Sequence, residues 1–198
     1  TLTSATVSGD VMYAVYLGRA LQTVNPPNAS VGLSQLSATG TKSSSTFLRG
    51  DNTFASAGGT NTPAFLATMS ASQNPSSASQ TLVNFNQTTY DTSSAFDTTN
   101  KKYVIPSAGY YHIYANVNMY NTSNDLDRII GYINIGGGTR FQTDIQIPNA
   151  PSAYVYLGGV YNCSASDAVE IKIYQVMGSG TTTIPTDKNY FGGYKLIS

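Results

Sequence analysis

From residue 64 onward the chain consists of short apolar or alternating runs, each bounded by turn residues. Turn signals recur every ~8 to 12 residues, which is typical of an all-β sandwich and not of alternating strands and helices. The composition agrees, because 15 Tyr and 18 Gly accompany abundant Ser, Thr and Asn, and Glu170 is the sole glutamate. The predicted strands are residues 64–69, 81–86, 102–105, 110–120, 128–135, 140–147, 154–163, 168–176 and 190–197.

Two connections between these strands can also be predicted. Gly136–Gly138 separates two alternating runs and predicts a β-hairpin. The stretch that follows Asn86 is polar and is predicted to be a loop.

The first 60 residues have a different amino-acid composition. They are poor in aromatic residues and carry one short apolar patch, residues 11–17, so they cannot bury enough surface to fold alone. Residues 56–63 are rich in Gly, Ser and Thr and predict a flexible joint. We therefore expect a stalk and linker over residues 1–62 and a folded head over residues 63–198.

The run from Tyr110 to Tyr120 has two distinct faces if it is a strand. One face is apolar and is predicted to be core, and its residues are Tyr111, Ile113, Ala115, Val117 and Met119. The other face carries large rings with polar tips, and the same mixture occurs around Tyr154, Tyr156 and Tyr161. Amphipathic rings on non-core faces favour burial against another polypeptide, so the pattern predicts self-association.

Charge and cysteine content exclude several classes of protein. Ten Lys and Arg against ten Asp and Glu give a net charge of zero, which cannot supply the cationic surface that nucleic acid binding requires. No apolar run approaches the ~20 residues of a membrane span, so no membrane insertion is expected. The single cysteine, Cys163, excludes an intramolecular disulfide, and stability must come from packing or oligomerisation.

The head resembles the globular domains of complement C1q and tumour-necrosis-factor-like proteins. The resemblance covers residues ~63 to 198 and rests on these residues in this order: Leu82–Phe85, Asp91, Phe96-Asp97, Tyr103–Pro106, Gly109–Ile113, Gly158–Val160, Asp167–Val169 and Phe191–Tyr194. Ile113 stands where the family usually has Phe, and Ser166 where it usually has Gly. The resemblance implies a ten-stranded jelly roll that forms a homotrimer around a tyrosine-lined axis. Its interface residues would be Tyr110, His112, Tyr114, Asn116, Tyr154 and Tyr156.

A second resemblance lies in the amino-terminal part. The segment from Leu36 to Ala55, which contains Ala-Thr-Gly and then Thr-Phe-Leu-Arg-Gly-Asp-Asn-Thr-Phe, is similar to an element near the distal domains of bacteriophage tail fibres. Asn52 stands where that element usually has Gly, and Phe54 where it usually has Trp. In such fibres the element threads three chains together before a terminal knob. This implies a short extended stalk ahead of the head.

Residues that could carry chemistry are few. His112 is the only histidine, and no nucleophile motif lies near it, so an enzyme is not expected. One His and one Cys exclude a zinc site, and residues 124–127 lack the spacing of a calcium loop, so no metal or cofactor is predicted. Arg49-Gly50-Asp51 matches an integrin-binding tripeptide, but the fibre element accounts for it without that function.

Together these observations predict a trimeric viral fibre knob that attaches a bacteriophage to its host. Its partners would be a host-cell receptor, with saccharide as the suggested class, and other virion proteins on the amino-terminal side. It would be located in the virion as an extracellular fibre and be made in the host cytoplasm. The predicted receptor-contact residues are Asn121, Asn124, Asp125, Asp127, Asn149, Ser152, Thr182 and Asp187. One alternative is a structural trimerisation head of a virion fibre that has no receptor role. The other is a secreted C1q-like module that binds carbohydrate or protein.

Overall fold

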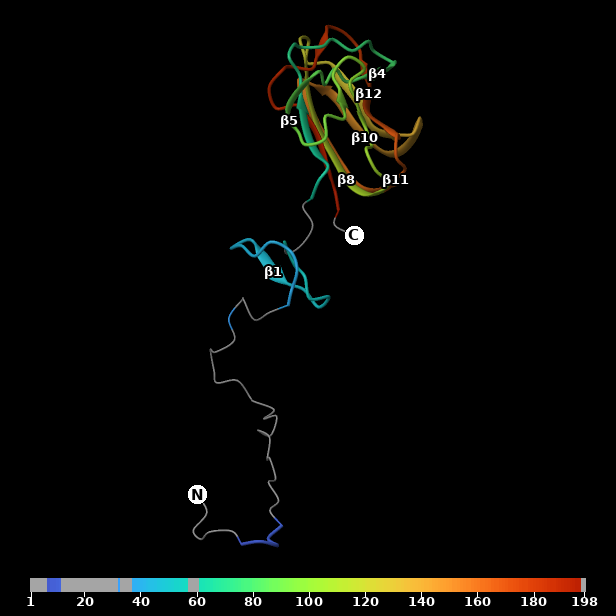
Figure 1. Cartoon of the computed structure of the whole chain (residues 1–198). Coiled ribbons are helices and arrows are strands. Elements are labelled where there is room, and N and C mark those ends of the chain that lie inside the picture. Colours follow the sequence, from blue (N-terminus) through green and yellow to red (C-terminus); the bar gives the residue numbers. More distant parts are fainter. Residues whose placement is uncertain (1–6, 12–31, 33–36, 57–60, 197–198) are drawn as a thin grey trace. The chain divides into compact units, whose positions relative to one another are not determined.

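The computed structural model describes residues 7–11, 32, 37–56 and 61–196. All regular structure in these ranges is β-strand, which confirms the predicted all-β class, and the described part has no helix that could cross a membrane. The chain divides into two compact units, Thr1–Ala57 and Gly58–Ser198, which are described separately (Figure 1). Much of the expected stalk, including nearly all of the apolar patch at residues 11–17, lies outside the described residues.

The first unit contains a small antiparallel hairpin of β1 (Thr46–Leu48) and β2 (Phe54–Ser56). Thr39 lies beside it, and its carbonyl oxygen accepts a 2.8 Å hydrogen bond from the N–H of Phe54. Gly40 is required here, because its φ is +91° and a Cβ would lie 2.4 Å from the carbonyl oxygen of Phe54. The two halves of the fibre-like element therefore meet in space.

The second unit, which we call the head, is a sandwich of two sheets with six strands each. Its strands are β3 (Ala64–Thr68), β4 (Gln80–Leu82), β5 (Gln87–Asp91), β6 (Phe96–Asp97), β7 (Lys102–Val104), β8 (Gly109–Asn121), β9 (Leu126–Ile135), β10 (Gly138–Ala150), β11 (Ser152–Cys163), β12 (Ala168–Met177), β13 (Thr182–Thr183) and β14 (Tyr190–Lys195). The total of twelve exceeds the ten that the resemblance implies, but β6 and β13 have only two residues each.

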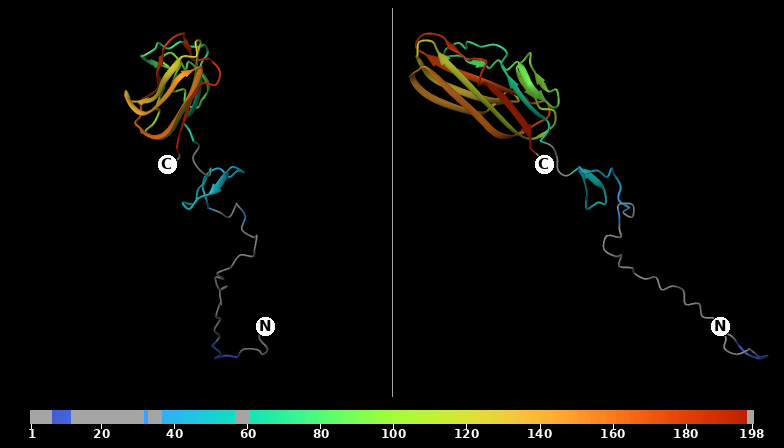
Figure 2. Two further views of the ribbon diagram at one scale, coloured as in Figure 1. Left: turned by 180° about the vertical axis from the view of Figure 1, so that it is seen from behind. Right: turned by 90° about the vertical axis from the view of Figure 1, so that its left-hand side faces the viewer.

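The two sheets are named after their central strands. In the β12 sheet the order is β10-β9-β12-β7-β6, and β4 also pairs with β12. In the β8 sheet the order is β11-β8-β14-β3-β5, and β13 also pairs with β8. Neighbouring strands are antiparallel, and the sheets pack face to face with the core between them (Figure 2). The head is therefore a jelly-roll sandwich.

The alternation along β8 sets which of its faces is core. Tyr111, Ile113, Ala115, Val117 and Met119 are each 0% exposed, as the sequence predicts. Because side chains of a strand point alternately to opposite faces, the intervening residues must lie on the other side of the sheet. Burial of this apolar face is the main stabilising term for the strand.

Aromatic rings fill the centre of the sandwich. Phe65 on β3 stacks on Tyr103 at 3.9 Å between ring centroids and meets Phe191 edge-on at 4.9 Å. Phe96 contacts the same cluster at 5.6 Å from Phe65. These rings come from both sheets, so they join the two layers of the sandwich.

The predicted hairpin at the three glycines is confirmed. β9 and β10 pair with Ile135 opposite Gly138. Gly136 and Gly137 turn the chain with φ of +61° and +82°, a region that favours glycine because it has no Cβ.

The prediction of a loop after Asn86 is wrong for residues 87–91. These residues form β5, the edge strand of the β8 sheet, which pairs with β3. Four of its five side chains are exposed, so it lacks the apolar alternation by which a strand is recognised in sequence. The preceding prediction, residues 81–86, shortens to β4, which ends at Leu82.

The head has two ends that differ in what they carry. The chain enters at Asn61 and leaves at Leu196 at the same end, where the N–H of Lys195 donates a 2.9 Å hydrogen bond to the carbonyl oxygen of Pro63 (Figure 1). β8 begins at this end with Gly109, since the N–H of Leu196 bonds to the carbonyl oxygen of Tyr110. β8 ends at Asn121 at the opposite end, which we call the distal end.

Candidate functional site

The outer side of the β8 sheet carries eight of the 15 tyrosines. Strand register places them on one surface, because each lies opposite another residue of that surface on the neighbouring strand. We call this surface the tyrosine face, and its rings are Tyr90, Tyr110, Tyr114, Tyr120, Tyr154, Tyr156, Tyr190 and Tyr194, with His112 and Asn116 between them.

The predicted interface residues share this face. Tyr110, Tyr154 and Tyr156 are 57%, 53% and 63% exposed, whereas His112, Tyr114 and Asn116 are half-buried within the single chain. Tyr161 is the exception among the tyrosines considered from sequence, because it lies opposite Tyr111 and packs against the core.

The tyrosine face is apolar and uncharged as well as exposed. None of the strand residues that share it is Asp, Glu, Lys or Arg. In the described part of the head, every large hydrophobic residue that is exposed lies on this face, apart from Phe141 on β10. Exposed apolar surface concentrated in this way on one sheet marks a surface that another molecule covers.

The centre of the face is tightly packed. The ring of Tyr114 lies over Gly192, where a Cβ would come within 2.7 Å of its Cζ atom. Tyr190 approaches the same ring at 6.1 Å between centroids. Burial, followed by the neighbouring Tyr90 hydroxyl, raises the pKa of Tyr114 to about 12, and burial raises the pKa of Tyr190 as well.

This raised pKa predicts loss of stability in alkaline solution. The folded state holds Tyr114 protonated above the ordinary pKa of 10.0, so its contribution is complete below pH ~10 and is lost as the pH rises toward ~12. Tyr103 in the core, whose pKa burial also raises to about 12, acts in the same sense. The denaturant midpoint should fall between neutral pH and about pH 11, and this fall should be smaller for Tyr114→Phe than for the wild type. An equal fall in the two proteins would contradict this role of Tyr114.

His112 lies among these rings. Its ring centroid is 5.5 Å from that of Tyr114 and 5.3 Å from that of Tyr194. Its Nδ1 atom is buried and forms no hydrogen bond to the described part of the chain. A catalytic histidine needs an orienting partner and a nucleophile within hydrogen-bond reach, and this geometry supplies neither at Nδ1.

Three predicted receptor loops come together at the distal end. Residues 121–127 follow β8, residues 149–152 join β10 to β11, and residues 178–187 follow β12. The Thr122 N–H donates a 3.1 Å hydrogen bond to the carbonyl oxygen of Thr181. The Asn149 N–H donates a 3.2 Å hydrogen bond to Oδ1 of Asp127. The loops therefore form one connected surface.

Two of the predicted contact residues are not on that surface. Asn121 is 3% exposed and Thr182 is 0% exposed, so the expectation that they contact a receptor is wrong. Their polar groups instead hold the loops together, and the sequence could not reveal this because exposed and buried loop amides look alike. The remaining predicted residues are exposed or half-buried: Asn124, Asp125, Asp127, Asn149, Ser152 and Asp187.

Asn121 joins the loops through both ends of its amide. Its Nδ2 donates to the carbonyl oxygen of Ser179 at 3.0 Å, and its Oδ1 accepts from the N–H groups of Ser123 at 2.8 Å and Asp125 at 3.1 Å. Removing this amide leaves partly buried backbone groups without these partners.

Asn121→Ala is therefore expected to lower the free energy of unfolding by about 1–3 kcal/mol. The matched control is Asn124→Gly, because Asn124 is exposed with φ of +55°, which glycine adopts freely, and it should stay within about 0.5 kcal/mol of wild type. Chemical denaturation of the two variants at equal protein concentration provides the measurement. Equal stabilities would contradict the structural role of Asn121.

A fourth distal loop, residues 70–79, was missed from sequence. Gln73 forms a β-bridge with Ile184, and the Nε2 of Gln175 donates a 3.1 Å hydrogen bond to the carbonyl oxygen of Pro75. The Ser and Asn content of the loop was visible, but its partners lie about 100 residues away in the chain. We call residues 70–79, 121–127, 149–152 and 178–187 together the distal loops.

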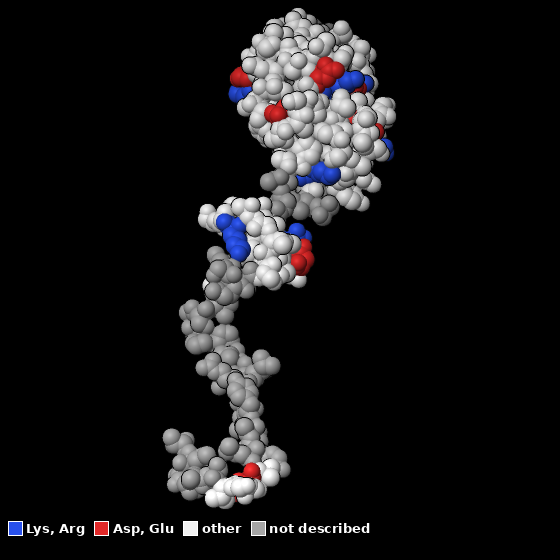
Figure 3. Space-filling view, viewed as in Figure 1, with Lys and Arg blue, Asp and Glu red and all other residues white. Residues whose placement is uncertain are grey.

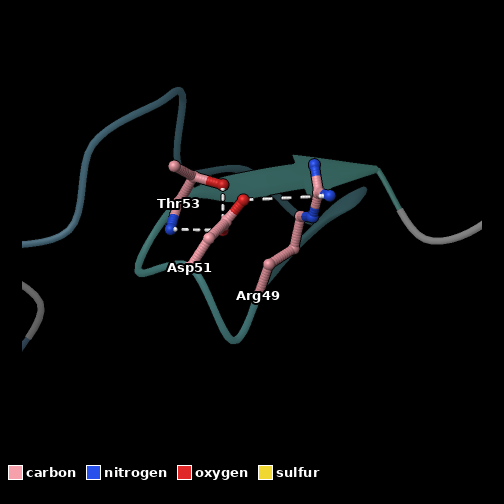
Figure 4. Close-up of polar contacts among 3 residues, drawn as sticks. All are labelled: Arg49, Asp51 and Thr53. Carbon is pink, nitrogen blue, oxygen red and sulfur yellow. Dashed lines mark hydrogen bonds and ion pairs between the residues drawn. The ribbon is translucent and has the colours of Figure 1, made fainter.

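The Arg49-Gly50-Asp51 tripeptide lies in the turn between β1 and β2. The Oδ1 of Asp51 accepts hydrogen bonds from the hydroxyl and the N–H of Thr53 at 2.6 and 3.1 Å, which lowers the pKa of Asp51 (Figure 4). The Arg49 guanidinium lies 3.8 Å from the other carboxylate oxygen. The two charged side chains thus face each other within the turn, which fits a structural role in the hairpin.

Few other groups in the described residues could support chemistry. Cys163 is buried, and burial raises the pKa of its thiol, which disfavours the reactive thiolate. No group of three or more His, Cys, Asp or Glu side chains that could hold a metal occurs in the described ranges. Charged side chains cover little of the visible face of the head, and acidic and basic ones lie in small mixed groups (Figure 3).

Comparison with known proteins places the fold. No family model and no curated protein sequence matches this chain. The globular domain of zebrafish complement 1qA matches with a TM-score of 0.51 and 14% identity over 68% of this chain and 97% of that domain. Murine APRIL matches with 0.53 and 14% over 67% and 98%, and the Eiger TNF of S. frugiperda with 0.50 and 14% over 68% and 91%. The head therefore has the jelly-roll fold of the C1q and tumour-necrosis-factor globular domains.

Proposed function

We propose that this chain is the distal part of a bacteriophage tail or head fibre, a homotrimer whose heads assemble through the tyrosine face and attach to the host through the distal loops. The observation that carries the proposal is the uncharged, partly exposed ring surface of the β8 sheet. Such a surface is too apolar to face water and is not used as core. Burying it against copies of the same chain explains why it exists.

A closed threefold assembly needs two different patches that meet, because its interfaces are heterologous. The tyrosine face is the first patch. Phe141 on the edge strand β10 is the one large exposed hydrophobic outside it in the described head, and it marks the second. The family that the sequence resembles forms such trimers.

The fibre assignment is supported by the first unit. There the fibre-like element closes on itself, because Gly40 packs against Phe54 and the N–H of Phe54 donates to the carbonyl oxygen of Thr39. A two-stranded hairpin is marginal alone, and linkage to a trimeric head would raise the effective concentration of three such hairpins. Other virion proteins would lie on the amino-terminal side, and the protein would be an extracellular part of the virion made in the host cytoplasm.

Attachment would be recognition without covalent chemistry and without a cofactor. The distal loops lie at the end of the head opposite to that at which the chain enters, and three copies of a weak contact would give avidity. The unpartnered Nδ1 of His112 and the buried thiol of Cys163 support recognition over catalysis.

Two measurements test this proposal. Light scattering of the purified chain at micromolar concentration should give the mass of three 21.0 kDa subunits, and the mass of one subunit would overturn it. Purified protein should then block adsorption of the parent virus to its host. A trimer that fails to block adsorption at saturating dose would instead favour a purely structural head, which only aligns the three chains of the fibre.

A further inference from the structure

The ionisable groups of the distal loops are all acidic. Asp125, Asp127 and Asp187 are the charged residues of these loops, which contain no Lys, Arg or His. Lys188 borders the last loop. Arg128 follows Asp127, but its Nε and Nη2 both donate to the carboxylate of Asp144, with Nε 2.9 Å from Oδ1. The surface therefore carries net negative charge.

Two of the three carboxylates are built into the loops. The hydroxyl of Ser179 donates to Oδ2 of Asp125 at 2.7 Å, and the Asn149 N–H donates to Oδ1 of Asp127 at 3.2 Å. An anionic ligand would thus meet like charge and would find no arginine fork to bind it.

Apart from the three aspartates, the groups of the distal loops that face solvent are neutral hydrogen-bonding groups. Hydroxyls and amides can both donate and accept, which complements the hydroxyl groups of an uncharged sugar. None of the large exposed hydrophobic residues of the described head lies in these loops, so an apolar ligand finds no surface there. The exposed neutral polar residues include Ser72, Asn74, Ser123, Asn124, Asn149 and Ser152.

The loops are also held in place before any ligand arrives. The fully buried amide of Gln175 donates to the 70–79 loop through the carbonyl oxygen of Pro75 and accepts from the hydroxyl of Thr182 at 3.3 Å. Asn121 joins the 121–127 and 178–187 loops. Preorganised groups lose little conformational entropy on binding, so weak polar contacts can give net affinity.

From charge, polarity and rigidity together we infer that the distal loops bind an uncharged saccharide and discriminate against anionic glycans. This inference rests on the proposed attachment function and names the chemistry of its ligand. Binding through neutral hydrogen bonds releases no bound counterions, so affinity should be nearly independent of salt concentration.

The test uses the full chain on an array that pairs neutral glycans with sulfated, phosphorylated and sialylated ones, at low and at high salt. Binding confined to neutral glycans with less than about a twofold change between the two salt conditions is expected. Binding to anionic glycans that weakens with salt would overturn the inference, and so would the absence of binding to any glycan.

The adsorption assay separates the two proposals. If the protein blocks virus adsorption but binds no neutral glycan, the inference fails and the attachment function stands. If it does neither, both fail.

A pair of variants locates the site. Ser123→Ala with Asn124→Gly removes two exposed polar groups from a distal loop and should weaken binding to the neutral glycan by about tenfold or more. The control, Thr98→Ala with Ser94→Gly, makes an equivalent change in exposed residues near the end at which the chain enters, and should leave binding unchanged. Equal affinities for the two variants would remove the site from the distal loops.

Discussion

Replacing Tyr156 with aspartate is expected to convert the proposed trimer into single subunits. Tyr156 is 63% exposed in the single chain and lies on the edge strand β11, within an uncharged surface and next to Tyr190. Assembly would bury the new carboxylate without a partner, which costs several kcal/mol. The dissociation constant should rise by at least about 100-fold, as measured by light scattering over a dilution series.

The control for this variant is Tyr132→Asp. Tyr132 is a half-buried tyrosine on the opposite side of the head, where it pairs with Lys172 between β9 and β12. The same chemical change there should leave the mass at three subunits. A trimeric Tyr156→Asp protein would show that the tyrosine face is not the interface, and a Tyr132→Asp protein that dissociates as readily would show that the effect is not specific to this face.

The largest effect on stability is expected for Phe65→Ala. Phe65 is 0% exposed and contacts three rings, Tyr103, Phe191 and Phe96, which belong to both sheets. Truncation loses the transfer free energy of the ring and leaves a cavity that rigid neighbouring strands cannot close. The free energy of unfolding should fall by about 3–5 kcal/mol in denaturant titrations at constant protein concentration.

Phe65→Leu provides the graded comparison. Leucine keeps most of the buried volume, so this variant should lose less than about 1.5 kcal/mol. If alanine and leucine gave the same loss, the effect would not come from the cavity, and the role of the ring cluster in joining the sheets would be contradicted.

The strands in which apolar and polar residues alternate strongly could be predicted from the sequence, because this signal lies within the strand itself. In β8 each apolar residue is separated from the next by a polar or amphipathic one, so burial of one face dictates both strand and orientation. In β5 four of five residues are exposed, and only its pairing with β3 makes it a strand. Such an edge strand leaves no periodic apolar signal.

Some residues of the candidate site could likewise be predicted from the sequence, and others could not. Tyr110, Tyr154 and Tyr156 could be placed on a non-core face from alternation alone, because the position of a residue within its own strand decides its side of the sheet. Tyr90 and Tyr194 could not be added, since their membership follows from the order of five strands. Asn121 looked like a contact residue, but two neighbouring loops bury it.

The amino-acid sequence alone was enough to predict the all-β class, the division between a weakly apolar amino-terminal part and a head, and the two faces of the long strands. These depend on composition and on the two-residue period, which are local properties. The folded arrangement of the strands was needed to show that eight rings share one uncharged surface and that four loops, with partners up to about 100 residues apart, meet at one end. Contacts between distant segments depend on strand order and register, and residue periodicity within one strand carries no information about either.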